Sequence, residues 1–156
     1  GRVVTELAHQ QSIARAVAYA DVLIGAVLAR GERTPRAVSR AMVETMKPGS
    51  VIVDVSIDQG GCVETSRPTT LADPVFAVGG VTHYCVPNMA SAVARTASLA
   101  LTGALLPSVR ALAGSGIEQA LANDRGLAAG IYVHRGRLVS EAVARAHGLS
   151  YAGAGR

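Results

Sequence analysis

The sequence predicts an α/β protein that contains the C-terminal half of a doubly wound parallel sheet, followed by a mostly helical segment. Residues 21–28 and 51–57 are near-continuous apolar runs, the pattern of strands buried on both faces in parallel sheets. Residues 34–47, between them, carry apolar residues at helical spacing. A strand, a helix and a strand with short joints form a crossover unit, and repeated units make a doubly wound sheet. After Asn88 the pattern becomes mostly helical.

The first two-thirds of the chain alternates helix and strand. Ser12 can cap a first helix. The apolar residues of that helix keep helical spacing and are Ile13, Ala16, Val17 and Ala20. The next helix is expected to begin with Thr34 as its N-cap, because Pro35 then takes the first helical position. It is expected to end at residues 47–49, Lys-Pro-Gly. A shorter third strand is expected over residues 76–78.

The last third is expected to be helical, with one short extended piece. In residues 89–101 the polar side chains fall on one helical stripe and nearly all the others are apolar. A helix that is apolar over so much of its circumference is expected to be mostly buried, between two domains or against another subunit. Further helices are expected over 107–122 and over 139–147, the latter stopped by Gly148, with an extended piece at 131–133 between them.

Composition excludes several classes of function. With 49% hydrophobic and 17% charged residues, the chain has the balance of a packed globular protein. The net charge of +4 comes from basic residues that are spread along the chain, and aromatic residues make up only 3%, so no nucleic-acid partner is expected. Two cysteines make no disulfide framework, and no Cys/His spacing resembles a metal site, so we expect a reducing, cytoplasmic setting. The longest apolar stretch, residues 97–106, is too short to span a bilayer, so no membrane partner is expected.

The candidate site lies where the predicted parallel strands end. Ligands of doubly wound sheets bind beyond the carboxyl ends of the strands, which places residues 25–28 and 57–61 at the site. Asp58 directly follows the second strand and precedes Gln-Gly-Gly, so its carboxylate is expected to point into the crevice. The alternative is a turn aspartate that binds its own loop amides, which is the commoner role for this position. Asp54, inside the strand, is interpreted as a hydrogen-bonded structural carboxylate.

Three other side chains are weaker candidates. Arg67 could hold an anionic group, although a loop arginine is usually only solvated. His83 is the one histidine near a strand-end loop and is a weak candidate for a catalytic base. Cys85 has no neighbouring base that would lower its pKa and is interpreted as an inert, small apolar residue. The glycine-rich fingerprint of dinucleotide binding is absent. The residues alone therefore indicate half of a doubly wound α/β domain with a strand-end site.

Several stretches resemble the family of alanine dehydrogenases and proton-translocating transhydrogenases. Residues 20–28 and 46–54 resemble stretches that both kinds of protein share. Residues 56–70, SIDQGGCVETSRPTT, resemble alanine dehydrogenases specifically, and residues 84–89, YCVPNM, match them as well. Shorter matches follow toward the end of the chain, at residues 101–102, Gly130, 136–138 and 141–144. The resemblance covers essentially the whole chain.

In that family a Rossmann domain is inserted into a discontinuous substrate domain, and the subunits assemble as hexamers. The resemblance implies that residues 1–94 are the C-terminal part of the NAD-binding Rossmann domain and that residues 95–156 return to the substrate domain. It implies a cytoplasmic, NAD-dependent oxidoreductase of amino-acid metabolism as the parent protein. The reaction would be the reversible oxidative deamination of L-alanine to pyruvate and ammonia.

The resemblance also implies roles for individual residues. Asp58 resembles the family's catalytic aspartate, which would orient the substrate nitrogen and stabilise developing positive charge. The positions that resemble the family's NAD contacts are Val27, Leu28, Val55, Ser56, Ile57, Asp58, Arg67, Val86, Pro87, Asn88 and Met89. Ala8 stands where members often have a serine near the adenosine, so no role is assigned to it.

We expect the chain to be a C-terminal fragment of such an enzyme. The phosphate-binding glycine loop, the acidic residue for the adenine ribose, and the family's catalytic His and substrate-binding Arg and Lys are expected upstream of Gly1. The fragment alone is then expected to be inactive and to bind NAD weakly. Two alternatives remain: the NAD-binding subunit of a transhydrogenase, which residues 20–54 fit nearly as well, and a non-catalytic assembly module that pairs subunits through residues 89–101.

Overall fold

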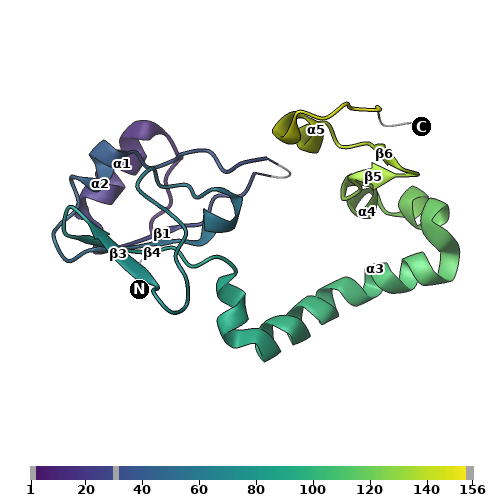
Figure 1. Cartoon of the computed structure of the whole chain (residues 1–156), viewed down its shortest axis with the longest axis horizontal. Coiled ribbons are helices and arrows are strands. Elements are labelled where there is room, and N and C mark those ends of the chain that lie inside the picture. The colour runs from purple at the N-terminus through teal and green to yellow at the C-terminus, as the bar shows by residue number, and fades with distance from the viewer. Residues whose placement is uncertain (1–2, 30–31, 154–156) are drawn as a thin grey trace. The chain divides into compact units, whose positions relative to one another are not determined.

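The computed structural model describes residues 3–29 and 32–153. It divides into two compact units, Gly1–Met89 and Ala90–Arg156. The first unit is a four-stranded sheet with helices and the second is mostly helical (Figure 1). The α/β fold class is therefore confirmed. The division falls near residue 94, where the two domains are expected to meet.

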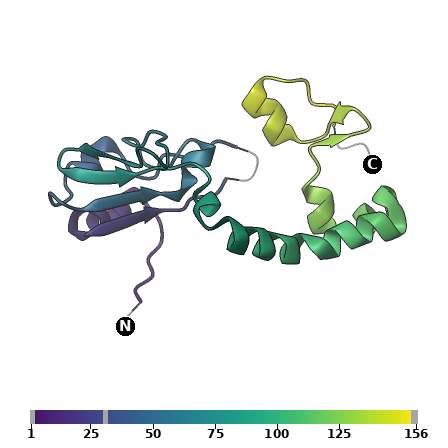
Figure 2. The ribbon, with the colours of Figure 1, turned by 60° about the horizontal axis from the view of Figure 1, so that its bottom comes forward.

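Four strands form the sheet of the first unit (Figure 2). In spatial order they are β1 (Val22–Gly25), β2 (Val51–Asp54), β4 (Val81–Tyr84) and β3 (Val75–Val78). Strands β1, β2 and β4 are parallel, and β3 pairs antiparallel with β4. The sheet is thus mixed, with the predicted parallel arrangement in three of its strands.

The third strand of the prediction is half of a hairpin. Only residues 76–78 are predicted as a strand, whereas β3 is followed by β4, which the prediction omits. Gly79 and Gly80 join the two strands with φ of 59° and 81°, and a two-residue hairpin turn with positive φ at both positions suits Gly-Gly. The apolar pattern hides β4 because it contains Thr82 and His83.

Both apolar runs form strands shorter than predicted. β1 ends at Gly25 and β2 at Asp54. β2 stops because the Asp54 carboxylate accepts the Ser56 N–H at 3.1 Å and caps a 3-10 helix, η1 (Val55–Gln59). The residues that follow each strand are therefore loops and turns at the edge of the sheet, and they are the residues that a ligand could reach.

The first helix forms as predicted, although its cap differs. Helix α1 (Gln10–Tyr19) begins after His9, whose Nδ1 accepts the Ser12 N–H while the Ser12 Oγ accepts the His9 N–H, both at 3.2 Å. Ser12 is thus the third helical residue of a reciprocal capping box and not the N-cap.

The predicted start of the second helix is wrong. Helix α2 (Arg40–Val43) begins after Ser39, whose side chain accepts the Met42 N–H. The segment before it is extended, because the N–H groups of Ala37 and Val38 donate to the Cys62 carbonyl at 2.8 and 3.1 Å. Such long-range bonds outweigh the local Thr34-Pro35 pattern, which belongs to no helix.

The sheet of the first unit is covered on one face. On that face Ile52, Val81 and His83 are buried. The hydrophobic core consists of Val17, Val38, Val43, Met46, Ile52, Cys62, Val63 and Val81. On the opposite face Val22 and Ile24 remain 58% and 67% exposed. Among the residues described, the strands are thus buried on one side only, and their other side is an apolar face that the described chain leaves uncovered.

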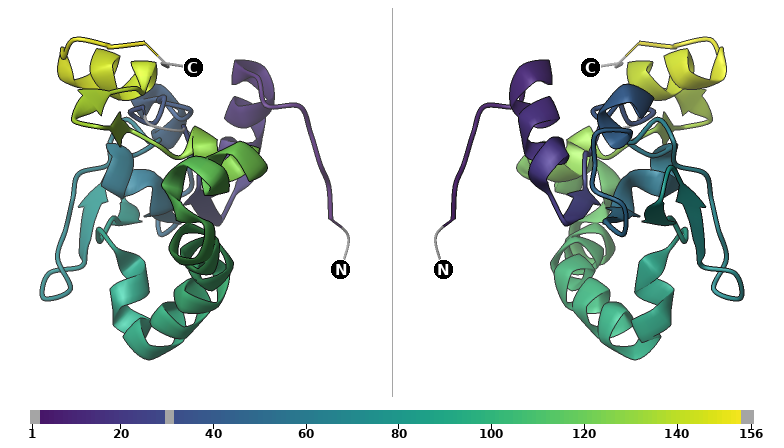
Figure 3. Two further views of the ribbon diagram at one scale, coloured as in Figure 1. Left: turned by 90° about the vertical axis from the view of Figure 1, so that its right-hand side faces the viewer. Right: turned by 90° about the vertical axis from the view of Figure 1, so that its left-hand side faces the viewer.

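The second unit is built around a long helix, which Figure 3 shows in green. The 3-10 turn η2 (Met89–Val93) leads into α3 (Ala94–Asn123), which continues through Pro107 and is interrupted at Gly116, where φ is 75° and ψ is 167°. Leu99 and Leu101 are exposed within the described chain, so the burial of residues 89–101 between two domains or against another subunit stays a prediction.

Helix α3 is also longer than the apolar stretch that the sequence suggests. Together η2 and α3, Met89–Asn123, are long and apolar enough to cross a membrane by length and composition alone, with a mean hydropathy of 1.3 in the most apolar window. The prediction that this stretch is too short to span a bilayer is therefore wrong on length. Core helices of soluble proteins meet the same criterion, so the criterion does not identify a membrane span.

The end of the chain follows the prediction closely. Helix α4 (Arg125–Ala129) precedes a hairpin of β5 (Val133–His134) and β6 (Arg137–Leu138). Helix α5 (Glu141–His147) has Ser140 as its N-cap and ends at Gly148, which is left-handed with φ of 62°. The predicted extended piece and the glycine stop are both present.

Candidate active site

The carboxyl ends of three parallel strands meet at one edge of the sheet. Gly25 of β1 is in register with Asp54 of β2, and Val53 is in register with Tyr84 of β4. The segments that leave these strands carry almost every residue predicted for the site, namely Val27, Leu28, Val55, Ser56, Ile57, Asp58, Val86, Pro87, Asn88 and Met89. The structure therefore brings together residues that are up to about sixty positions apart in the sequence.

A buried carboxylate supports this edge from beneath. Asp54 is 0% exposed and accepts the N–H groups of Ser56, Cys62 and Val63 at 3.1, 3.0 and 3.1 Å. The interpretation of Asp54 as a structural carboxylate is confirmed. Its bonds hold the loop after η1 against the end of β2, which fixes the position of η1 itself.

Two glycines make room for this buried carboxylate and its neighbours. A Cβ on Gly61, where φ is +79°, would lie 2.8 Å from the Asp54 Oδ2, and a Cβ on Gly25 would overlap the Sγ of Cys62. Burial, and secondarily the Asp54 charge, raises the pKa of the Cys62 thiol, so Cys62 stays a neutral packing group. The strand ends are thus closely packed beneath the site.

A second pair of hydrogen bonds joins the ends of β1 and β2. The Val27 N–H donates to the Ser56 Oγ at 2.8 Å, and the Ser56 hydroxyl donates to the Val27 carbonyl at 2.9 Å. Ser56, Ile57 and Val86 are buried, so these three predicted contact residues offer little surface to a ligand in this chain.

Asp58 presents its carboxylate at the edge, at the exposed side of η1. Both of its oxygens accept the Asn88 N–H, at 2.9 and 3.1 Å. The alternative of a turn aspartate that binds its own loop amides does not describe this carboxylate, because Asn88 lies on the segment that follows β4. Asp58 therefore bridges two strand ends while remaining accessible.

Apolar side chains are also exposed on the segments that leave the strand ends. Leu28 and Val55 are 71% and 44% exposed, and Val27, Pro87 and Met89 are partly exposed. Apolar side chains exposed on the same strand-end segments as an accessible carboxylate suit a ligand with an apolar face and a polar or cationic group.

Arg67 lies in the loop beside the end of β4. The Thr69 N–H donates to the Cys85 carbonyl at 3.0 Å, which ties this loop to the strand end. The Arg67 guanidinium lies over the Phe76 ring, 4.2 Å from its centroid, and Phe76 stacks on His83 with ring centroids 4.9 Å apart. Phe76, the only phenylalanine in the chain, is predicted as a strand residue, but its contact with Arg67 is not. Arg67 is exposed above this ring, so its guanidinium can also meet an anion.

His83 and Cys85 take no part in catalysis at this edge. His83 is 0% exposed, and its Nδ1 donates to the Val81 carbonyl at 3.0 Å, so its Nε2 accepts the Thr65 hydroxyl at 2.7 Å. Burial lowers the pKa of His83, which keeps the ring neutral. Burial also raises the pKa of the Cys85 thiol, in agreement with its interpretation as inert. Within the described residues, no group of three or more His, Cys, Asp or Glu could hold a metal ion.

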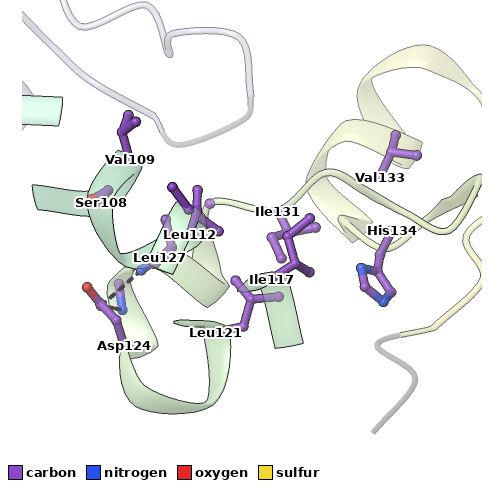
Figure 4. Close-up of a pocket in the computed structure, with 13 residues that line it drawn as sticks. Ser108, Val109, Leu112, Ile117, Leu121, Asp124, Leu127, Ile131, Val133 and His134 are labelled. Atoms are coloured by element: carbon purple, nitrogen blue, oxygen red, sulfur yellow. Dashed lines mark hydrogen bonds between the residues drawn. The ribbon is translucent and has the colours of Figure 1, made fainter. Parts of the chain in front are cut away.

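The second unit contains an apolar groove of about 880 Å³, which the sequence does not predict (Figure 4). Its lining comes from α3, α4 and the segment up to β5 and includes Leu112, Ile117, Leu121, Leu127 and Ile131. The Asp124 carboxylate at its edge already accepts the N–H groups of Gly126 and Leu127 as the cap of α4. No set of free polar groups converges on this groove, so the strand-end edge is the better candidate for chemistry.

Known proteins share both the sequence and the fold of this chain. The family model "Alanine dehydrogenase/PNT, C-terminal domain" matches residues 1–141. The alanine dehydrogenase of Halomonas elongata is 54% identical over 151 residues, which are 97% of this chain and 41% of that protein. The alanine dehydrogenase of Mycolicibacterium smegmatis is 48% identical over 145 residues, 93% of this chain and 39% of that protein. The chain thus spans about two-fifths of the length of these curated relatives.

Two solved structures are similar as well. An L-alanine dehydrogenase has a TM-score of 0.71 and 51% sequence identity, covering 88% of this chain and 38% of that structure. A transhydrogenase from Sinorhizobium meliloti has a TM-score of 0.53 and 36% identity, covering 58% of this chain and 26% of that structure. The first similarity extends over more of the chain at higher identity.

Proposed function

The chain belongs to the alanine dehydrogenase/PNT C-terminal domain family, and from that premise we propose that it is part of an NAD-dependent L-alanine dehydrogenase. The reaction is the reversible oxidative deamination of L-alanine to pyruvate and ammonia. The accessible Asp58 carboxylate among exposed apolar side chains at the strand ends is the observation that supports it most. In this proposal residues 1–94 belong to the NAD-binding domain and residues 95–156 to the substrate domain.

The strand-end edge fits a nicotinamide dinucleotide. Leu28 and Val55 offer exposed aliphatic surface for the face of a planar ring, and the segments after β1, β2 and β4 offer main-chain groups for its amide and ribose. Arg67, exposed above Phe76, can pair with an anionic group of the same ligand. When bound, the nicotinamide supplies the hydride acceptor. The predicted NAD contacts around Val27, Ser56, Asn88 and their neighbours remain proposals of the same kind.

Asp58 has the chemistry that the deamination needs beside the reacting carbon. As the Cα–H bond of alanine breaks and the C–N bond gains double-bond character, positive charge develops on the substrate nitrogen. An anionic carboxylate stabilises that charge and accepts a hydrogen bond from the nitrogen, which orients it. His83 is buried with both ring nitrogens bonded, so the base that removes the proton from this nitrogen must be another group. We assign it to a part of the protein outside this sequence, as the resemblance implies.

We further propose a cytoplasmic homo-oligomer, a hexamer by the family resemblance. Both cysteines are buried and unpaired, which suits a reducing compartment. The exposed leucines of α3, including Leu99, Leu101 and Leu105, offer apolar surface for a neighbouring domain or subunit. Sedimentation of the full-length protein tests the assembly; a monomer would refute it.

A transhydrogenase is the second candidate, because one such structure matches 58% of the chain. An assay of the full-length protein separates the two. Reduction of NAD that depends on L-alanine supports the dehydrogenase, whereas hydride exchange between NADH and an NADP analogue without alanine supports the transhydrogenase. Absence of alanine-dependent reduction in folded, full-length protein would reject the proposed function.

A further inference from the structure

Among the described residues, one main-chain group, the Asn88 N–H, donates to both oxygens of the Asp58 carboxylate. The proposed function assigns the chemistry to the Asp58 carboxylate, and the following inference rests on that proposal. We propose that Asn88 is the positioning residue for Asp58, acting through its backbone N–H and the left-handed conformation of its main chain. This role is separate from any contact that the Asn88 side chain makes with a cofactor.

The contact between the two residues is specific in its geometry. One N–H group lies 2.9 Å from the Oδ1 and 3.1 Å from the Oδ2 of Asp58, so it is shared almost equally by both oxygens. A donor placed between the two oxygens fixes the direction of the carboxylate and resists its rotation. A carboxylate has about four acceptor positions, so it can still accept a hydrogen bond from a substrate nitrogen.

The backbone of Asp58 is already fixed from the other side. Asp54 caps η1 at its start, and Gly60, with φ of 99°, ends it. The Ser56 hydroxyl bonds the Val27 main chain through both its donor and its acceptor. With the main chain held in this way, the side-chain torsions of Asp58 are its remaining freedom, and the Asn88 N–H is the contact that limits them.

Asn88 adopts a backbone conformation that few residues tolerate. Its φ is 52°, and among the described residues only Arg135 is a second non-glycine residue with positive φ. This torsion joins the peptide plane that carries the N–H to the chain that leaves for η2. A residue that relaxes to negative φ therefore changes the direction of the N–H that Asp58 accepts. Asparagine and glycine accept the left-handed region more readily than alanine does.

Two substitutions distinguish the role of the Asn88 main chain from that of its side chain. Asn88→Gly and Asn88→Ala both remove the side-chain amide, but only glycine keeps the left-handed conformation without strain. In the full-length protein we expect kcat for L-alanine to be about tenfold lower in Asn88→Ala than in Asn88→Gly. The KM for NAD is expected to be the same in both variants, because both have lost the same side-chain group. Equal kcat values in the two variants would overturn the proposal.

Amide hydrogen exchange supplies a readout that needs no activity. In full-length protein the Asn88 amide is expected to exchange faster in Asp58→Ala than in the wild type, because its acceptor is gone. Asp73→Ala serves as the matched control, since it removes an exposed carboxylate outside the strand-end segments. Unchanged exchange at Asn88 would refute the hydrogen bond and the proposal with it. Faster exchange in a protein that lacks alanine-dependent activity would instead reject the proposed function, and the catalytic role of the bond with it.

Discussion

Replacing Gly61 with alanine perturbs the buried carboxylate that supports the strand-end site. Gly61 has a φ of +79°, and an added Cβ would lie 2.8 Å from the Asp54 Oδ2, 3.3 Å from the Ile57 Cδ1 and 3.4 Å from an Arg36 nitrogen. The Oδ2 of Asp54 accepts the N–H groups of Cys62 and Val63 at 3.0 and 3.1 Å. The added carbon must therefore push this oxygen from two of its donors.

The magnitude follows from two contributions. An alanine in the left-handed region costs about 1–2 kcal/mol relative to glycine. Weakening hydrogen bonds to a buried charged group adds about 2–3 kcal/mol. Gly61→Ala is therefore expected to lower the free energy of unfolding by about 3–5 kcal/mol. Gly49 is the matched control, because its φ is +87° and a Cβ there would meet nothing within 4 Å. Gly49→Ala should incur only the conformational cost of about 1–2 kcal/mol.

Denaturant unfolding of the two full-length variants and the wild type measures this difference. We expect Gly61→Ala to unfold at a clearly lower denaturant concentration than Gly49→Ala. Because η1 rests on the Asp54 bonds, we also expect kcat to fall in Gly61→Ala and to stay at the wild-type value in Gly49→Ala. Equal stability of the two variants would refute the argument that Asp54 supports the site through close packing.

Three further predictions concern other parts of the chain. The free energy of unfolding should decrease as the pH falls below about 6.5. Burial lowers the pKa of His83 in the folded protein, so the unfolded chain binds the proton first. Acid unfolding of the His83→Gln variant should lack this dependence. Phe76→Leu should raise the KM for NAD about two- to fivefold, because it removes the ring under Arg67. Arg67→Ala should raise the KM further. An unchanged KM in both variants would remove Arg67 from the cofactor site. The 156-residue chain alone should show no dehydrogenase activity. Its titration with NAD should give a dissociation constant weaker than micromolar, which is less than about 8 kcal/mol of binding free energy. Tighter binding would show that the main determinants of NAD binding lie within this chain.

Local pattern predicted much of the fold. The apolar runs that contain β1 and β2, the helical spacing of α1 and the glycine stop of α5 are all properties of residues close in sequence. The prediction failed where distant contacts decide the local structure. Residues 37–38 are extended because they bond Cys62, and β4 contains the buried His83, whose partner Thr65 lies eighteen residues away.

The candidate site was likewise predictable where local pattern and topology decide it, and not where distant contacts do. Its place at the strand ends follows from the topology of parallel sheets, so position alone placed Asp58 at this edge, while its catalytic role was implied by the family resemblance. Its partner could not, because the Asn88 N–H approaches from a segment thirty residues further along the chain. The ring of Phe76 beneath Arg67 likewise depends on the antiparallel pairing of β3 with β4. The apolar surface of α3 predicted burial, but the surface that would cover it is not among the described residues.

Turnover of L-alanine by the Asp58→Asn variant of the full-length protein tests the central claim most directly. Asparagine keeps the size of the side chain and one acceptor oxygen but removes the negative charge that the developing cation requires. We expect kcat for alanine-dependent NAD reduction to fall about 100-fold or more, with Asp73→Asn at the wild-type rate. Wild-type turnover by Asp58→Asn would contradict the account and remove Asp58 from the mechanism.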